Sequence, residues 1–142
     1  EGQGDNRDVS SDVQAAIVMC GPMNLLLPHI IERVEKAANN PKGDAIIDFM
    51  GGALPEQKTG IYVEASPLTH LNSRTPPMLF IDGEFDRPRI RYTEFWLKMD
   101  ELEIPHEFLM MPKAPHPFWG MREWFMPTIN AVDTFLKKYL QK

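Results

Sequence analysis

The amino-acid sequence predicts an α/β fold with about three parallel strands and flanking helices. Three short apolar runs each end at a turn-forming Gly or Pro. Amphipathic helical spacing appears between them, so strands and helices alternate along the chain, as in a parallel sheet. Thirteen of the 142 residues are proline, against a usual share of about 5 %. This density indicates well-defined loops rather than a long helical bundle. Right-handed crossovers are expected to join the strands.

The first half of the chain is expected to contain one strand and two helical segments. The apolar run Val13–Cys20 has the length of a buried strand and is followed by Gly-Pro. A helix is expected over Pro28–Ala38, because a proline loses no hydrogen bond in the first helical turn, and it should stop at Asn39–Pro41. A second helical turn is expected over Asp44–Met50. Pro55–Arg74 has no sustained period and indicates a loop with a turn or two of helix.

The second half has clearer patterns. Strands are predicted over Met78–Asp82 and His106–Met111, each closed by a turn-forming residue. The apolar residues of Tyr92–Leu102 lie on one face of a helix. A loop rich in Pro and Trp is expected over Lys113–Met126, and Pro127–Leu140 should form the last helix, opened by its proline.

Composition and charge exclude several classes of protein. A net charge of −5 and a pI of about 5.3 disfavour a nucleic-acid binder. The longest apolar runs are about six residues, short of the ~20 that a membrane helix needs. Cys20 is the only cysteine, so neither an internal disulfide nor a cysteine-based zinc site is expected. The four histidines show no paired metal-ligand spacing, so no metal and no cofactor are expected. Residues 1–12 are polar and should form an exposed loop.

Two loops at the predicted sheet edge carry acid–base chemistry. In a parallel sheet, the loops that follow the carboxyl ends of the strands gather ligands and catalytic residues. Asp86 follows the second predicted strand and His116 follows the third. One crossover brings these loops side by side, so an Asp–His contact is expected. A carboxylate beside an imidazole fixes its tautomer and stabilises the imidazolium when histidine acts as a base. The alternative is that His116 is a solvated or capping loop residue.

Other candidate residues have plainer interpretations. Phe118, Trp119 and Trp124 follow the candidate histidine and could either line a substrate pocket or cover the sheet edge; both interpretations stay open. Cys20 ends a buried strand and is expected in the core rather than as a nucleophile. Glu84 is expected to be a solvated loop charge.

Five segments of the chain match a known pattern in the same order. They are Glu1–Ala16, Cys20–Leu25, Glu64–His70, Pro76–Asp86 and Ala114–Trp119. Together they resemble α/β-hydrolase esterases of the acetyl-xylan-esterase and feruloyl-esterase-like group. The Asp86 segment matches the family's strand followed by Gly-x-x-Asp with the catalytic Asp last. The His116 segment matches the catalytic-histidine loop, although Pro replaces the more usual Gly around the histidine.

The resemblance also shows what the 142 residues lack. Such esterases carry Ser, Asp and His in this chain order, with Ser in a Gly-x-Ser-x-Gly turn. No serine of this chain lies in such a turn, and the upstream His-Gly-Gly oxyanion segment is also missing. The chain therefore resembles the C-terminal portion of an α/β-hydrolase fold, a single incomplete domain over residues 1–142.

The resemblance implies a part of a serine hydrolase acting on carboxylic esters, with acylated carbohydrates among the candidate substrates. Asp86 and His116 would complete a Ser-Asp-His triad whose Ser lies upstream, so the chain alone is expected to be inactive. Its partners are expected to be a small ester substrate and either the missing N-terminal half or a second copy paired edge to edge, with no nucleic acid and no membrane. The alternatives are a prolyl-oligopeptidase-type serine peptidase, which shares this half, and a non-catalytic α/β binding module.

Overall fold

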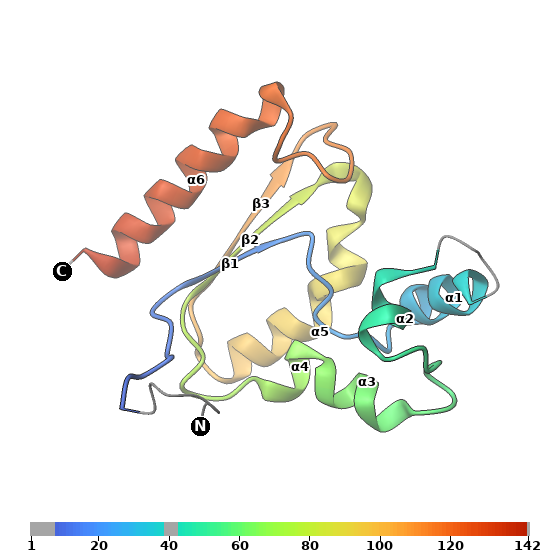
Figure 1. Cartoon of the computed structure of the whole chain (residues 1–142). Coiled ribbons are helices and arrows are strands. Elements are labelled where there is room, and N and C mark those ends of the chain that lie inside the picture. Colours follow the sequence, from blue (N-terminus) through green and yellow to red (C-terminus); the bar gives the residue numbers. More distant parts are fainter. Residues whose placement is uncertain (1–7, 39–42, 142) are drawn as a thin grey trace. The chain divides into compact units, whose positions relative to one another are not determined.

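The computed structural model describes residues 8–38 and 43–141 (Figure 1). Strands and helices alternate along the chain, as the sequence predicts. Their order is β1 Ala16–Met19, α1 Pro28–Ala37, α2 Ala45–Phe49, α3 Thr59–Ala65, α4 Pro67–His70, β2 Met78–Gly83, a 3-10 turn Glu84–Asp86, α5 Pro88–Glu101, β3 His106–Met111 and α6 Arg122–Leu140. No helix in the described part of the chain is both long and apolar enough to cross a membrane.

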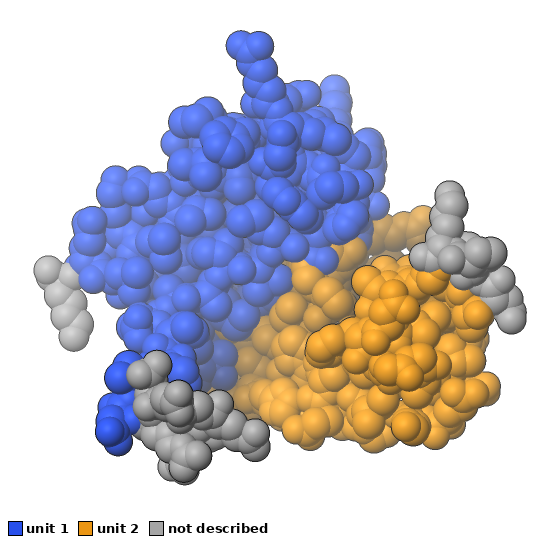
Figure 2. Space-filling view, viewed as in Figure 1, with its two compact units in different colours: residues 1–20, 74–86, 104–142 blue, residues 21–73, 87–103 orange. Residues whose placement is uncertain are grey.

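The described residues form two compact units, each made of separate chain segments (Figure 2). The sheet unit holds residues 8–20, 74–86 and 104–141, and thus the strands and α6. The helical unit holds residues 21–38, 43–73 and 87–103, and thus α1 to α5. Each unit is described by itself below.

Within the described residues, the strands form one parallel sheet in the order β1-β2-β3. Ala16 pairs with Met78, and Met78 pairs with His106. All six residues of β2 are buried, as expected for the central strand of a parallel sheet. The three predicted strands and their parallel arrangement are confirmed. β1 is shorter than the predicted Val13–Cys20, since the residues of Asp8–Gln14 are exposed and only Ala16–Met19 pair with β2.

The core of the sheet unit lies between the sheet and α6, which runs alongside the strands in Figure 1. Leu79 and Ile81 point to the same face because side chains alternate along a strand. They pack with Phe135 of α6, and these three side chains are at most 3 % exposed. Burying such a side chain stabilises the fold by about 1.5–3 kcal/mol. The packing holds α6 against the sheet.

Helix α6 begins earlier than the sequence predicts. The prediction placed its start at Pro127, but the helix begins at Arg122 and Pro127 lies inside it. Proline is disfavoured inside a helix because it has no N–H for the backbone bond. Packing outweighs this cost here, since Trp124 contacts the same core as Phe135. The hydroxyl of Thr128 also donates to the carbonyl of Trp124 at 2.7 Å.

The helical unit contains more helix than predicted. Pro55–Arg74 was expected to be mostly loop, yet it forms α3 and α4. Tyr62 anchors α3: its ring is fully buried with Leu25 and Met50, and its hydroxyl donates to the carbonyl of Ala53 at 2.8 Å. This anchor comes from tertiary packing, which a search for helical periodicity does not detect.

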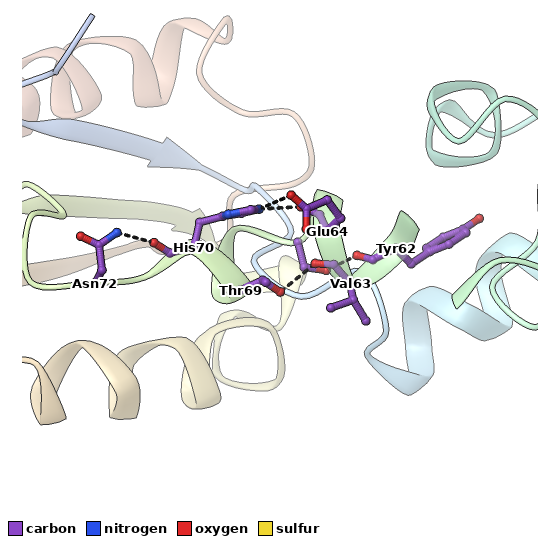
Figure 3. A network of polar contacts seen from close by, with 7 residues as sticks. Tyr62, Val63, Glu64, Thr69, His70 and Asn72 are labelled. Carbon is purple, nitrogen blue, oxygen red and sulfur yellow. Dashed lines mark hydrogen bonds and ion pairs between the residues drawn. The ribbon is translucent and has the colours of Figure 1, made fainter. Parts of the chain in front are cut away.

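Polar side chains also close the C-terminal end of α3 (Figure 3). The last carbonyls of a helix have no partner within the helix. Here the Ser66 hydroxyl donates to the carbonyl of Tyr62 and the Thr69 hydroxyl to that of Val63, at 2.6 and 2.7 Å. Figure 3 shows the ring of His70 turned back to Glu64, whose carbonyl lies 2.5 Å from Nε2. This nitrogen therefore carries the proton, and the three side chains end α3 sharply before α4.

The other helical predictions are largely confirmed. Helix α1 starts at Pro28, as predicted, whereas its predicted stop at Asn39–Pro41 lies outside the described residues. The predicted turn over Asp44–Met50 is α2, and the Asp44 side chain caps it by accepting the N–H of Ile46 at 2.9 Å. Serine, threonine and aspartate are preferred at this position because they satisfy an unpaired backbone N–H.

Candidate active site

The candidate site lies in the sheet unit, where the strands reach their carboxyl ends. Asp86 closes the 3-10 turn that continues directly from β2. His116 lies in the loop between β3 and α6. The chain turns sharply at both places, since Arg87 and Lys113 have φ values of 52° and 56°. Such left-handed backbone is uncommon for residues other than glycine and is often found at functional sites.

The structure brings the predicted pair into contact. His116 Nδ1 lies 3.2 Å from Asp86 Oδ2, within hydrogen-bond distance. The side chain of Asp86 is 10 % exposed and that of His116 is 54 % exposed. Asp86 is therefore held inside while the histidine ring reaches the surface. With Nδ1 on the carboxylate, Nε2 lies on the other side of the ring, where a histidine that acts as a base exchanges its proton.

Two further contacts hold the Asp86 and His116 loops together. Gly83, the last residue of β2, has no side chain, and a Cβ there would lie 2.5 Å from the carbonyl oxygen of Ala114. Only glycine allows this approach without a shift of the backbone. The carboxylate of Glu84 accepts the N–H of Lys113 at 2.8 Å. Glu84 is exposed, as expected of a solvated loop charge, and its carboxylate also joins the two loops.

Cys20 is a third member of the site, and its contact was not predicted. Its Sγ lies 2.9 Å from Oδ2 of Asp86, the oxygen that also faces His116. Burial, followed by the hydrogen bond to Asp86, raises the pKa of the Cys20 thiol well above its ordinary value. The thiol therefore stays protonated and donates its S–H to the carboxylate. Cys20 also belongs to the buried core, as predicted.

A signal for this contact was present in the sequence. Cys20 directly follows β1, so it lies at the same carboxyl-end edge as the Asp86 and His116 loops. Residues that follow the carboxyl ends of parallel strands gather at one edge of the sheet. This rule predicted the contact between Asp86 and His116, and it applies equally to Cys20. Its φ of 53° shows that the chain turns sharply here too. Together, the Cys20, Asp86 and His116 ligand atoms lie within 4.8 Å of one another and could hold a metal ion.

The three aromatic pocket candidates lie at different depths. Phe118 is fully buried in the core of the sheet unit. Trp124 is partly buried against the same core, and its indole N–H donates to the carbonyl of Pro112 at 3.2 Å. Trp119 is 36 % exposed and meets the ring of His116 edge-on, with ring centroids 5.7 Å apart. Of the three, Trp119 is the one that presents a surface beside the candidate base.

Comparisons with solved structures identify the fold. A truncated carbohydrate esterase from gut microbiota superposes with a TM-score of 0.68 at 17 % identity, over 94 % of this chain and 46 % of that protein. A thermophilic esterase from the planctomycete Thermogutta terrifontis gives a TM-score of 0.62 at 20 % identity, over 97 % of this chain and 46 % of the esterase. The chain has the fold of a portion of an α/β-hydrolase. It spans about half the length of these esterases.

A peptidase has a similar arrangement. A puromycin-hydrolyzing peptidase from Mycobacterium tuberculosis gives a TM-score of 0.64 at 22 % identity, over 90 % of this chain and 18 % of that protein. No protein-family model and no curated protein matches the sequence. The likeness establishes the α/β-hydrolase fold predicted from the sequence, and it includes both esterases and a peptidase.

Proposed function

We propose that this chain provides the acid and the base of a serine hydrolase that acts on carboxylic esters. The observation that carries the proposal is the contact between Asp86 and His116 at the carboxyl-end edge of the sheet. The resemblance of both loops to the catalytic loops of esterases supports it, as does the fold shared with two esterases. The nucleophile in this proposal is a serine outside these 142 residues.

In the first step, His116 Nε2 takes the proton of the serine hydroxyl while the serine oxygen attacks the ester carbonyl carbon. A tetrahedral intermediate forms, and the ring becomes an imidazolium. Asp86 stabilises this cation, because its carboxylate faces Nδ1 at 3.2 Å. The S–H of Cys20 donates to the same carboxylate and keeps it oriented. Cys20 is thus a positioning residue.

In the second step, the imidazolium returns its proton to the leaving alcohol oxygen as the carbon–oxygen bond breaks. An acyl-serine ester remains. His116 then takes a proton from water, the hydroxide attacks the acyl carbon, and the serine leaves with its proton restored. No cofactor takes part in this sequence.

The proposed substrates are small carboxylic esters, with acylated carbohydrates as the leading class. Trp119 offers an exposed aromatic surface next to the base, and such a surface can pack against an apolar or sugar group. The carbohydrate esterase among the fold neighbours favours the same class.

A serine peptidase is the second candidate, because a puromycin-hydrolyzing peptidase shares the fold. The same Asp–His pair would then protonate a leaving amine instead of an alcohol. In a third candidate, a non-catalytic binding module, the Asp86–His116 contact would be only a structural hydrogen bond.

Completion of the sheet is part of the proposal. In the described residues β1 and β3 are the outer strands, and the outer strands of a sheet are templates for further pairing. The rest of the hydrolase is the proposed partner, and edge-to-edge pairing of two copies is the alternative. The 142 residues alone should hydrolyse no ester, since they lack the serine turn.

A fluorophosphonate probe tests the proposal on the intact protein. The probe forms an oxygen–phosphorus bond with an activated serine as fluoride leaves, and peptide mapping identifies that serine. We expect one labelled serine, outside residues 1–142, and slower labelling in His116→Ala. No labelling, or labelling that His116→Ala does not slow, would contradict the proposal. An ester and an amide with the same acyl group then separate esterase from peptidase.

A further inference from the structure

We propose that Cys20, Asp86 and His116 form a binding site for a thiophilic divalent cation such as Zn²⁺. One sulfur, one carboxylate oxygen and one imidazole nitrogen converge here from the ends of three separate strands. These are the three ligand types that zinc takes in proteins. Cys20 and Asp86 are 66 residues apart in the chain, and Asp86 and His116 are 30 apart. The three ligands therefore form no short spacing motif that could be recognised in the sequence.

The distances fit a zinc ion after small movements. With Zn–S of about 2.3 Å, Zn–N and Zn–O of about 2.0–2.1 Å and tetrahedral angles, neighbouring ligand atoms lie about 3.3–3.5 Å apart. Asp86 Oδ2 lies 2.9 Å from Cys20 Sγ and 3.2 Å from His116 Nδ1. All three ligand atoms lie within 4.8 Å of one another. A cation therefore requires Asp86 Oδ2 to move slightly away from both partners, and the sulfur and the ring nitrogen to lie about 3.5 Å from each other.

The hydrogen bonds show that the sulfur and the imidazole nitrogen converge on one oxygen of Asp86. The S–H of Cys20 and the ring nitrogen of His116 both face one oxygen of Asp86. A bound cation replaces the thiol proton, which goes to solvent, and a coordinating thiol is deprotonated. The ring proton that faces Asp86 must then move from Nδ1 of His116 to Nε2, so that Nδ1 offers its lone pair to the cation. One cation then bonds to sulfur, oxygen and nitrogen together. Two negative ligands, a thiolate and a carboxylate, balance its charge.

The three ligand residues differ in burial, so the site is enclosed on one side and open to solvent on the other. Cys20 is 7 % exposed and the Asp86 side chain 10 %, whereas the His116 side chain is 54 % exposed. Three protein ligands leave the fourth tetrahedral position open, as in zinc sites that keep a water. The exposed ring of His116 is the side of the site from which a water or ion can enter. Mg²⁺ and Ca²⁺ prefer sites made of oxygen atoms, so the thiol and the imidazole select against them.

The cation and the proposed catalysis need the same atoms. A metal on Nδ1 of His116 and on Oδ2 of Asp86 removes the hydrogen bond that orients the base. Zinc should therefore inhibit ester hydrolysis; this consequence, unlike the binding itself, rests on the proposed function.

Cobalt spectroscopy of the intact protein tests the site without any enzymatic activity. Co²⁺ bound to a thiolate gives a sulfur-to-metal charge-transfer absorption. We expect this absorption to appear at one Co²⁺ per protein, to disappear in Cys20→Ala, and to be displaced by Zn²⁺ but not by Mg²⁺. His116→Ala and Asp86→Asn should weaken Zn²⁺ binding by at least about 10-fold. Even the loss of a residue that only hydrogen-bonds to a metal ligand lowers metal affinity by about 10–100-fold.

His70→Ala and His106→Ala are the matched controls, because both rings bind backbone carbonyls elsewhere in the structure. Neither change should alter the cobalt absorption. Two results would overturn the proposal: no absorption that depends on Cys20, or an absorption that survives in both His116→Ala and Asp86→Asn. Circular dichroism of each variant checks that it is folded. Because binding is read directly, a protein that binds Co²⁺ but hydrolyses no ester would refute the proposed function alone.

Discussion

The candidate site of the sheet unit and the polar cap of α3 in the helical unit differ in the range of the contacts that form them. In the sheet unit, Cys20 and Asp86 are 66 residues apart in the chain, yet their side chains share a hydrogen bond. In the helical unit, the polar network at the end of α3 joins residues four to six positions apart, such as Ser66 with Tyr62 and His70 with Glu64. The candidate site thus needs the whole topology of the sheet unit to form, whereas the polar cap of α3 is formed by residues that are neighbours in sequence.

This difference concerns function as well as stability. A parallel sheet aligns the carboxyl ends of strands that are distant in sequence, so chemistry-bearing loops meet at one edge. Local capping fixes where a helix ends but brings no distant groups together. Changes in the sheet unit should therefore affect catalysis first, and changes at the α3 cap should affect stability alone. Substitutions in each unit test this distinction.

Removing the proposed base, His116, should have the largest effect. In the intact protein, His116→Ala should lower kcat for ester hydrolysis on the order of 10⁴-fold or more, and Asp86→Asn on the order of 10⁴-fold. The melting temperature should change little in His116→Ala, because that side chain is 54 % exposed. Steady-state kinetics with an activated ester measure the effect, and His70→Ala is the control. Unchanged turnover in His116→Ala would remove this residue from the mechanism.

Gly83→Ala should damage both stability and activity. The new Cβ would meet the carbonyl oxygen of Ala114 at 2.5 Å, so the His116 loop must move away from β2. Such overpacking costs about 1–3 kcal/mol, which urea denaturation can measure, and the displaced loop should also lower kcat. Gly120→Ala is the matched control in the same unit, since a Cβ there meets nothing within 4 Å. Equal stability of the two variants would contradict the close approach.

Thr69→Val should weaken the helical unit without affecting the site. The variant keeps the shape of the side chain but loses the hydroxyl that donates to the carbonyl of Val63. The expected loss is about 0.5–1.5 kcal/mol in the free energy of unfolding. Ser73→Ala, which removes an exposed hydroxyl of the same unit, should cost less. The ester-hydrolysis rate of folded protein should stay the same; a kcat loss as large as that of Gly83→Ala would abolish the distinction between the units.

The smallest effect is the pH dependence of His29. Burial, followed by the charges of Arg91, Arg33 and Arg87, lowers the pKa of His29 below its ordinary value of 6.5. The folded state therefore binds this proton less readily than the unfolded state. The stabilising contribution is present above pH 6.5 and is lost as the pH falls towards the lower folded pKa. In the pH range between the folded pKa and 6.5, the melting temperature should fall less steeply with decreasing pH in His29→Gln than in the unmodified protein. An identical slope in both proteins would contradict the shift.

The order of the elements was predictable from the sequence alone. Short apolar runs closed by Gly or Pro give β2 and β3, and the apolar face of Tyr92–Leu102 gives α5, because these patterns depend on neighbouring residues. The contact between Asp86 and His116 was also predictable. It follows from a topological rule: successive parallel strands joined by a crossover place their following loops at one edge.

Three other features depend on contacts between segments that are distant in sequence. Trp124 reaches the same core as Phe135 and extends α6 across Pro127, against the local preference of proline. Buried Tyr62 holds α3 where the sequence has no sustained helical period. The thiol of Cys20 looks like one more apolar group until β1 pairs with β2 and brings it to Asp86. In each case the deciding energy comes from contacts between distant segments, and such contacts exist only once the chain has folded.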